Sequence, residues 1–209
     1  MPRRSILSAA ERAALLAIPG NTEDLIRLYA FNDADLALIR QHRGPANRLG
    51  FAVQLCYLRF PGIVLEQGKR PFPPLLKIAA EQLKVAPALW DDYGRRDETR
   101  REHLQELQAA HGFRPFSAEH YDLTVDHLSE LAGQTDRGFV LAEGMLASLR
   151  KQHVLLPSMK VIERICAEAL TRVRTGWRWH SANWGALNGR CLFSIGCKTP
   201  NCAGGYRRD

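Results

Sequence analysis

Arginine side chains gather around a helix–turn–helix pattern in the first third of this 209-residue chain. Arg48 and Arg59 follow the turn at Gly44-Pro45 and are eleven residues apart. On a helix they therefore point within about 20° of the same side, roughly 16 Å apart along the axis. A guanidinium binds phosphate and guanine with two parallel hydrogen bonds, so this spacing predicts contacts with DNA. The candidate DNA-binding residues are Arg40, Arg43, Arg48, Arg59, Lys69 and Arg70.

Motifs of common enzymes are missing from the sequence. It contains no HExxH, GxSxG or GxGxxG pattern. The segment 62–70 resembles a phosphate-binding loop, but five residues instead of four separate Gly62 from Gly68. Arg70 also stands where a Ser or Thr would hold magnesium. We therefore predict no catalytic residue and no cofactor, and the segment is interpreted as a basic turn.

The five cysteines do not form a typical metal site or a disulfide framework. Cys191, Cys197 and Cys202, with His180 upstream, could supply four zinc ligands. Their gaps of five and four residues fit poorly, because structural zinc sites use pairs of closely spaced ligands. We predict no metal ion here. Cys56 and Cys166 are predicted to be small core hydrophobes on helix faces.

The net charge of +7 is concentrated toward the ends of the chain. Residues 1–70 carry ten basic and six acidic side chains, whereas residues 71–157 carry ten and thirteen. A basic surface suits an anionic partner such as nucleic acid, although it can also serve solubility alone. No stretch approaches the roughly 20 apolar residues of a membrane span. These features predict a cytoplasmic, nucleoid-associated protein with no membrane partner.

The elements that position these residues are predicted to be helices. Leu and Ala total 53 residues and Ile and Val only 17, which favours an all-α fold. Asp97 and Arg101, four residues apart on one such helix, are expected to form an ion pair. Capping residues, prolines and the 3.6-residue period predict helices that begin near Ser8, Thr22, Asn32, Ala46, Pro74, Pro87, Asp97, Ser117, Asp136 and Pro157.

The helical pattern ends at Thr175. Residues 1–175 are predicted to form a compact multi-helix domain with helix-turn-helix-like elements, in lobes 1–70 and 71–175. Residues 176–209 hold 3 of the 4 Trp, 6 of the 16 Gly and 3 of the 5 Cys without sustained periodicity. We predict an irregular tail here. The break in composition fits either a new small domain or a shifted reading frame.

One block of the sequence resembles a known protein family. Asn47-Arg48-Leu49-Gly50-Phe51-Ala52-Val53-Gln54-Leu55 and Leu58-Arg59-Phe60-Pro61-Gly62 are similar to the N-terminal region of the large replicative transposases of the Tn-three class. The similarity continues through Pro73-Pro74-Leu75-Leu76 and Arg100-Arg101-Glu102-His103-Leu104 and covers about residues 1–175. The resemblance implies a helical region that binds the terminal inverted repeats of a transposon. It also implies that catalysis belongs to a later RNase H-like domain, which this chain does not reach.

The sequence therefore predicts a truncated, non-catalytic DNA-binding fragment of a transposase. Its expected partners are double-stranded DNA carrying the terminal inverted repeats and other transposase subunits. The alternative is a helical protein-interaction module that assembles a transpososome or binds another protein partner, without binding specific DNA. Salt separates the two hypotheses, because phosphate binding weakens steeply with salt and apolar binding does not.

Overall fold

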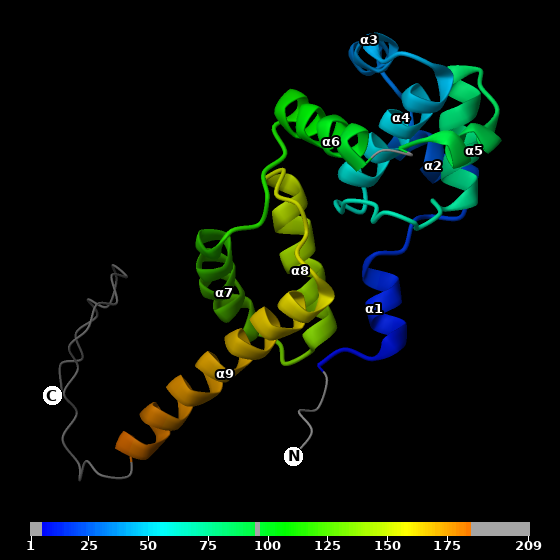
Figure 1. Ribbon diagram of the computed structural model, residues 1–209. Helices are drawn as coiled ribbons and strands as arrows, with labels where there is room; N and C mark the ends of the chain where they lie inside the picture. The colour runs from blue at the N-terminus through cyan, green and yellow to red at the C-terminus, as the bar shows by residue number, and fades with distance from the viewer. Residues whose placement is uncertain (1–5, 95–96, 185–209) are drawn as a thin grey trace, which may run out of the picture. The chain divides into compact units, whose positions relative to one another are not determined.

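The chain folds into helices connected by short segments. The computed structural model describes residues 6–94 and 97–184, with side chains described up to Thr175. These ranges contain nine α-helices, one 3₁₀ helix and no β-strand, which confirms the all-α prediction (Figure 1). The elements are α1 (Ala9–Leu15), α2 (Thr22–Tyr29), α3 (Asp33–Gln41), α4 (Pro45–Arg59), α5 (Pro73–Leu83), η1 (Pro87–Asp92), α6 (Asp97–His111), α7 (Ala118–Ala132), α8 (Gly138–Lys151) and α9 (Met159–Trp184).

Local sequence signals explain most of the helix starts. Ser8, Asn32 and Ser117 each accept a hydrogen bond from the third residue of the helix that follows. Such a bond satisfies one of the free N–H groups at a helix start. The predicted cap at Asp136 is wrong: the N-cap of α8 is Arg137, which makes no side-chain cap bond. Gly138, the first residue of α8, packs so closely against Ile6 that a side chain there would overlap it.

Three clusters of buried side chains form the interior of the first of two compact units, Met1–Val173. The first cluster joins α1 to α7, α8 and α9. The second joins α2, α4, α5 and η1, and the third joins α3, α4 and α6. Because α1 packs with helices that follow residue 117, the first cluster draws on both proposed lobes, and the division at residue 70 stays a prediction.

Cys56 and Cys166 confirm the prediction that they are small core residues. Their exposures are 1% and 0%, and burial raises the pKa of each thiol to about 12. A thiol with such a pKa stays protonated at neutral pH and is a poor nucleophile or metal ligand.

The second unit comprises Arg174–Asp209. The backbone of α9 remains helical to Trp184, past Thr175, where we expected the helical pattern to end. Cys191, Cys197 and Cys202 lie outside the described residues, as does the side chain of His180. Among the described helices, none combines the length and the apolar character that a membrane span requires.

Candidate nucleic-acid interface

The turn between α3 and α4 is held by Arg48. Its Nε donates to the carbonyl oxygen of His42 at 2.9 Å, and its Nη2 donates to that of Arg40 at 3.3 Å. Both carbonyls lie at the C-terminal end of α3, where helix carbonyls lack intrahelical partners and the helix dipole is negative. Gly44, with a φ of 79°, and Pro45 then start α4. Arg48 therefore fixes the direction in which the chain leaves α3.

Two arginines of this turn carry unpaired charges. Arg40 and Arg43 are exposed. Within the described part of the chain, neither side chain has a hydrogen bond or an ion pair. Because Arg40, Arg43 and Arg48 lie within nine consecutive residues, three of the six predicted residues share one turn. Two of their guanidinium groups are available to an anionic partner.

Lys69 and Arg70 lie in the segment between α4 and α5. Lys69 pairs with Glu66 at 2.7 Å, and Arg70 pairs with Asp91 at 2.9 Å. The side chains of Lys69 and Arg70 are 64% and 80% exposed. Exposed ion pairs contribute little free energy, so a phosphate could replace either carboxylate. The two residues are accessible but less free than Arg40 and Arg43.

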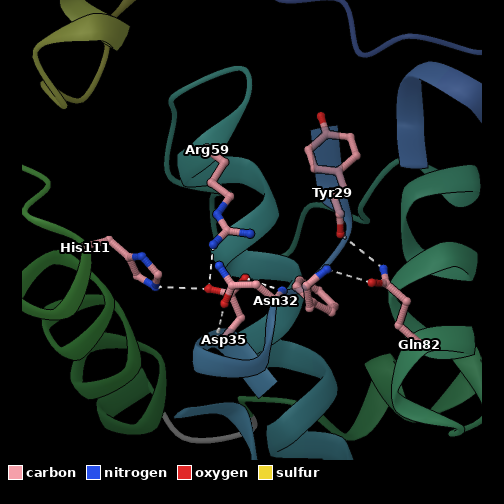
Figure 2. Close-up of polar contacts among 7 residues, drawn as sticks. Tyr29, Asn32, Asp35, Arg59, Gln82 and His111 are labelled. Atoms are coloured by element: carbon pink, nitrogen blue, oxygen red, sulfur yellow. Dashed lines mark hydrogen bonds and ion pairs between the residues drawn. The ribbon is translucent and has the colours of Figure 1, made fainter. Parts of the chain in front are cut away.

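Arg59 has a different environment from the other predicted residues. Its Nη2 lies 2.5 Å from Oδ1 of Asp35, whose side chain is only 1% exposed (Figure 2). His111 Nε2 lies 4.0 Å from the same oxygen. A buried carboxylate needs a cation or several hydrogen bonds, because removing it from water is costly. Arg59 therefore acts as the counter-ion of Asp35.

Asp35 also takes part in the N-terminal cap of α3. Its backbone N–H donates to Asn32 Oδ1 at 2.8 Å, and its Oδ2 accepts from the Asn32 N–H at 2.9 Å. One carboxylate thus joins the start of α3 to the end of α4 through Arg59. The sequence analysis missed this residue. The Asn32-x-x-Asp35 spacing, which resembles a capping box, was the available signal.

Gln82 of α5 extends the same polar network. Its Oε1 accepts from the Phe31 N–H at 2.8 Å, and its Nε2 donates to the Tyr29 carbonyl at 3.1 Å (Figure 2). These bonds fix the short connection between α2 and α3 against α5. Together with Asp35 and Arg59, they set the position of α3. They thereby also position the turn between α3 and α4 that carries Arg40 and Arg43, which is called the basic turn below.

The exposed surface of α4 is limited to its first turn. All ten residues from Leu49 to Leu58 are buried. The predicted order of helix, turn and helix is present, but a recognition helix needs an exposed face along its length. Outside these ten residues, Pro45 to Arg48 are exposed or half-buried, and the half-buried Arg59 is paired with Asp35. Any contact with DNA at this place must use the turn and the first turn of α4.

A histidine cluster lies behind this turn. The His42 ring is 4.0 Å from Phe51 and 4.3 Å from His103 of α6, centroid to centroid. The Tyr93 hydroxyl lies 3.2 Å from His103 Nδ1. Burial, with a smaller effect of His42, lowers the pKa of His103 to about 4, and burial also lowers the pKa of His42. Both rings are therefore neutral at pH 7, pack α6 against the turn and add no charge to the basic surface.

Comparison with known proteins places the chain among transposase sequences. The family model described as "Domain of unknown function (DUF4158)" matches residues 6–169. The chain is 62% identical over 172 residues to the transposase for transposon Tn21 of Escherichia coli. It is 52% identical to that for transposon Tn501 of Pseudomonas aeruginosa and 31% identical to that for transposon Tn1546 of Enterococcus faecium.

The aligned region is most of this chain but a small part of each relative. It covers 82% of the chain for the Tn21 and Tn501 proteins and 79% for the Tn1546 protein. In all three cases the chain spans about 17% of the length of the relative. The predicted resemblance to transposases of the Tn-three class is confirmed. The chain therefore belongs to the DUF4158 domain family, in the form found in these transposases.

Proposed function

We propose that this chain binds duplex DNA carrying the terminal inverted repeats of its transposon, as the non-catalytic DNA-binding part of a transposase. The observation that carries the proposal is the basic turn between α3 and α4. Arg40 and Arg43 are exposed there and have no side-chain partner among the described residues, and Arg48 holds the backbone that presents them. The kinship with transposases supplies the class of nucleic acid.

The contacts that we propose are mainly electrostatic. Arg40 and Arg43 neutralise phosphates, and the positive end of the α4 dipole, next to the same turn, adds to the attraction. Lys69 and Arg70 add contacts by exchanging their carboxylate partners for phosphates. Arg59 is left out of the contact set because its guanidinium is committed to Asp35.

The proposal assigns strand cleavage and joining to the rest of a full-length transposase. The chain spans only about 17% of the length of the Tn21 relative, so in this proposal it corresponds to one part of a larger protein. In this proposal the chain acts on the nucleoid, and other transposase subunits are its protein partners.

A competition binding assay tests the proposal. The full chain is titrated with labelled duplex carrying the terminal repeat at about 150 mM salt, against unlabelled repeat or scrambled duplex. We expect the repeat to compete better. Equal competition by both duplexes would overturn specific recognition. An affinity that does not change with salt concentration would favour the protein-interaction alternative.

Charge variants identify the surface that contacts DNA. The double variant Arg40→Gln/Arg43→Gln should reduce the slope of log affinity against log salt by up to about 1.8, since each lost phosphate contact contributes about 0.9. The matched control is Arg137→Gln/Lys160→Gln, which removes the same charge from the exposed N-cap residue of α8 and from an exposed residue of α9. An equal loss of slope in both variants would show that net charge, not the basic turn, drives binding.

A further inference from the structure

A small cavity lies between α4, the segment that follows it and the first half of α6. Its volume is about 180 Å³. Val64, Leu65 and Leu104 supply apolar walls, and Gln54 of α4 and Arg101 of α6 also line it. None of these five residues belongs to the basic turn. The cavity is therefore a feature of the fold that the proposed function does not use.

Gln54 is the unusual member of this lining. Its side chain is 2% exposed, in the middle of the buried helix α4. Its Oε1 is buried and accepts no hydrogen bond. Within the described residues, no hydrogen bond of its amide nitrogen is present either. Buried polar groups are nearly always paired, because an unpaired one forfeits its bonds to water. A ligand in the cavity could donate to Oε1 and accept from Nε2.

The other polar groups of the lining already have partners. Asp97 accepts a hydrogen bond from Gln67, and Glu66 pairs with Lys69 at 2.7 Å. The predicted ion pair between Asp97 and Arg101 is wrong for this reason: the Asp97 carboxylate is bound by Gln67 instead.

Of the two arginines in the lining, Arg100 already has partners and Arg101 is available to a ligand. The guanidinium of Arg100 lies 5.3 Å from the Tyr93 ring centroid and donates to the Leu65 carbonyl at 3.2 Å. Arg101 is exposed, and in the described part of the chain it has no hydrogen bond or ion pair. The groups left for a ligand are therefore one carboxamide and one guanidinium.

Size and chemistry together select the ligand. Sites for drug-sized molecules and cofactors measure about 300–1,000 Å³, so a cavity of about 180 Å³ holds only a small planar group. A Gln carboxamide forms two parallel hydrogen bonds with a base edge on which a donor stands beside an acceptor, and every unpaired nucleobase has such an edge. A guanidinium at the rim suits a phosphate attached to that base.

We propose that this cavity binds a single unpaired nucleobase, with Gln54 pairing with its edge and Arg101 contacting the attached phosphate. The base can come from a free nucleotide or from an unpaired base extruded from a DNA duplex. Only the second source rests on the proposed function. The site itself would stand if the basic turn did not bind DNA.

Calorimetric titration of the full chain tests the site. The probes are adenosine monophosphate, thymidine monophosphate and ribose 5-phosphate, and we expect each nucleotide to bind at least tenfold more tightly than ribose 5-phosphate, which has no base. Gln54→Leu should weaken binding of adenosine monophosphate at least about tenfold, because two hydrogen bonds are lost. Arg101→Gln, a change at an exposed position, should weaken the nucleotide more than it weakens adenosine.

Further arms separate the sources of the base and the two proposals. A repeat duplex with one bulged adenine should bind more tightly than the unbulged duplex, and Gln54→Leu should remove only that difference. If the bulge has no effect while the nucleotide binds, the source is the free nucleotide. Arg40→Gln/Arg43→Gln should keep nucleotide binding, so a failure of the basic turn leaves the cavity testable.

The proposal is overturned if adenosine monophosphate does not bind at millimolar concentration. It is also overturned if ribose 5-phosphate binds equally well, or if a folded Gln54→Leu variant keeps full affinity. Folding of each variant is checked by its thermal unfolding transition. If Gln54→Leu does not fold, Arg101→Gln tests the proposal instead. An equal loss of affinity for adenosine monophosphate and adenosine in that variant would overturn it.

Discussion

Arginine has three different roles around α3 and α4. Arg59 neutralises the buried Asp35, Arg48 binds backbone carbonyls at the end of α3, and Arg40 and Arg43 stay exposed without partners. The difference comes from what each guanidinium can reach, since the residue type is the same. Substitutions of these arginines should therefore have separable effects on stability and on binding.

Arg59→Gln should destabilise the fold without acting through DNA. Loss of one partner of a buried ion pair leaves an uncompensated charge and costs about 3–5 kcal/mol. Arg43→Gln, at an exposed position, should change the free energy of unfolding by less than about 0.5 kcal/mol. Urea denaturation at pH 7 measures both. Equal stability of the two variants would mean that Asp35 finds another partner when Arg59 is lost.

The sequence could not distinguish these roles. Spacing placed Arg48 and Arg59 on one side of a helix, but Asp35 lies 24 residues before Arg59, so only the tertiary fold brings them together. The same holds for Gln54, whose position in a family-like block carried no sign that its amide is buried without a partner. The placement of these residues on helices was predictable from the sequence, whereas the side chains that they contact were not.

At the scale of elements, α4 is the central helix of the second and third clusters. It contacts α2, α3, α5, η1 and α6. Sequence analysis predicted the existence of every described helix, because caps and prolines act locally. The 3.6-residue period of one helix cannot reveal that its neighbours cover all its faces, so the burial of α4 from Leu49 to Leu58 was not predictable.

Gly50→Ala should test how closely α4 packs against its neighbours. A methyl group at Gly50 would overlap the ring of Tyr93, whereas Gly20 has no atom within 4 Å of the same position. Overpacking costs about 1–3 kcal/mol. Gly20→Ala should be neutral or stabilise by up to about 1 kcal/mol, because it restricts the unfolded chain. Thermal denaturation of both variants gives the comparison, and a Gly50→Ala protein as stable as the wild type would contradict this packing.

The contact between α6 and the α3–α4 turn should weaken in acid. His103 is 5% exposed and its pKa is lowered to about 4, below the ordinary value of about 6.5. Between these values the unfolded chain binds a proton that the folded chain does not, so stability falls as pH falls through this window. The slope is about 1.4 kcal/mol per pH unit, or about 3 kcal/mol in total.

A variant separates this effect from that of the carboxylates. His103→Phe keeps the ring contacts with Phe51 and Tyr93 but cannot bind a proton. The free energy of unfolding of the wild type minus that of His103→Phe should fall steadily as the pH is lowered from 7 to 4.5 in urea titrations. The exposed His127→Phe serves as the control and should show no such trend. A constant difference for His103→Phe would show that this ring does not gain its proton on unfolding.

At the scale of the whole molecule, the described buried clusters all belong to the first of the two compact units. All three buried clusters, with the side chains packed against them, lie between Ile6 and Val173. The change in composition that the sequence shows after Thr175 falls close to the boundary between the two compact units, at Val173 and Arg174. The composition changes there because apolar residues at helical spacing are lost, and the domain division itself stays a prediction.

The first unit should fold without the second. A chain that ends at Thr175 keeps every side chain of the three clusters, and these supply the buried apolar area that offsets the entropy of ordering the backbone. We expect its melting temperature to lie within about 2 °C of that of the full chain, because a change of 1 kcal/mol shifts a protein of this size by about 2–4 °C. Calorimetry of both chains under identical conditions measures the difference. A drop of several degrees would show that residues 176–209 stabilise the first unit, and the chain would then have to be treated as one cooperative structure.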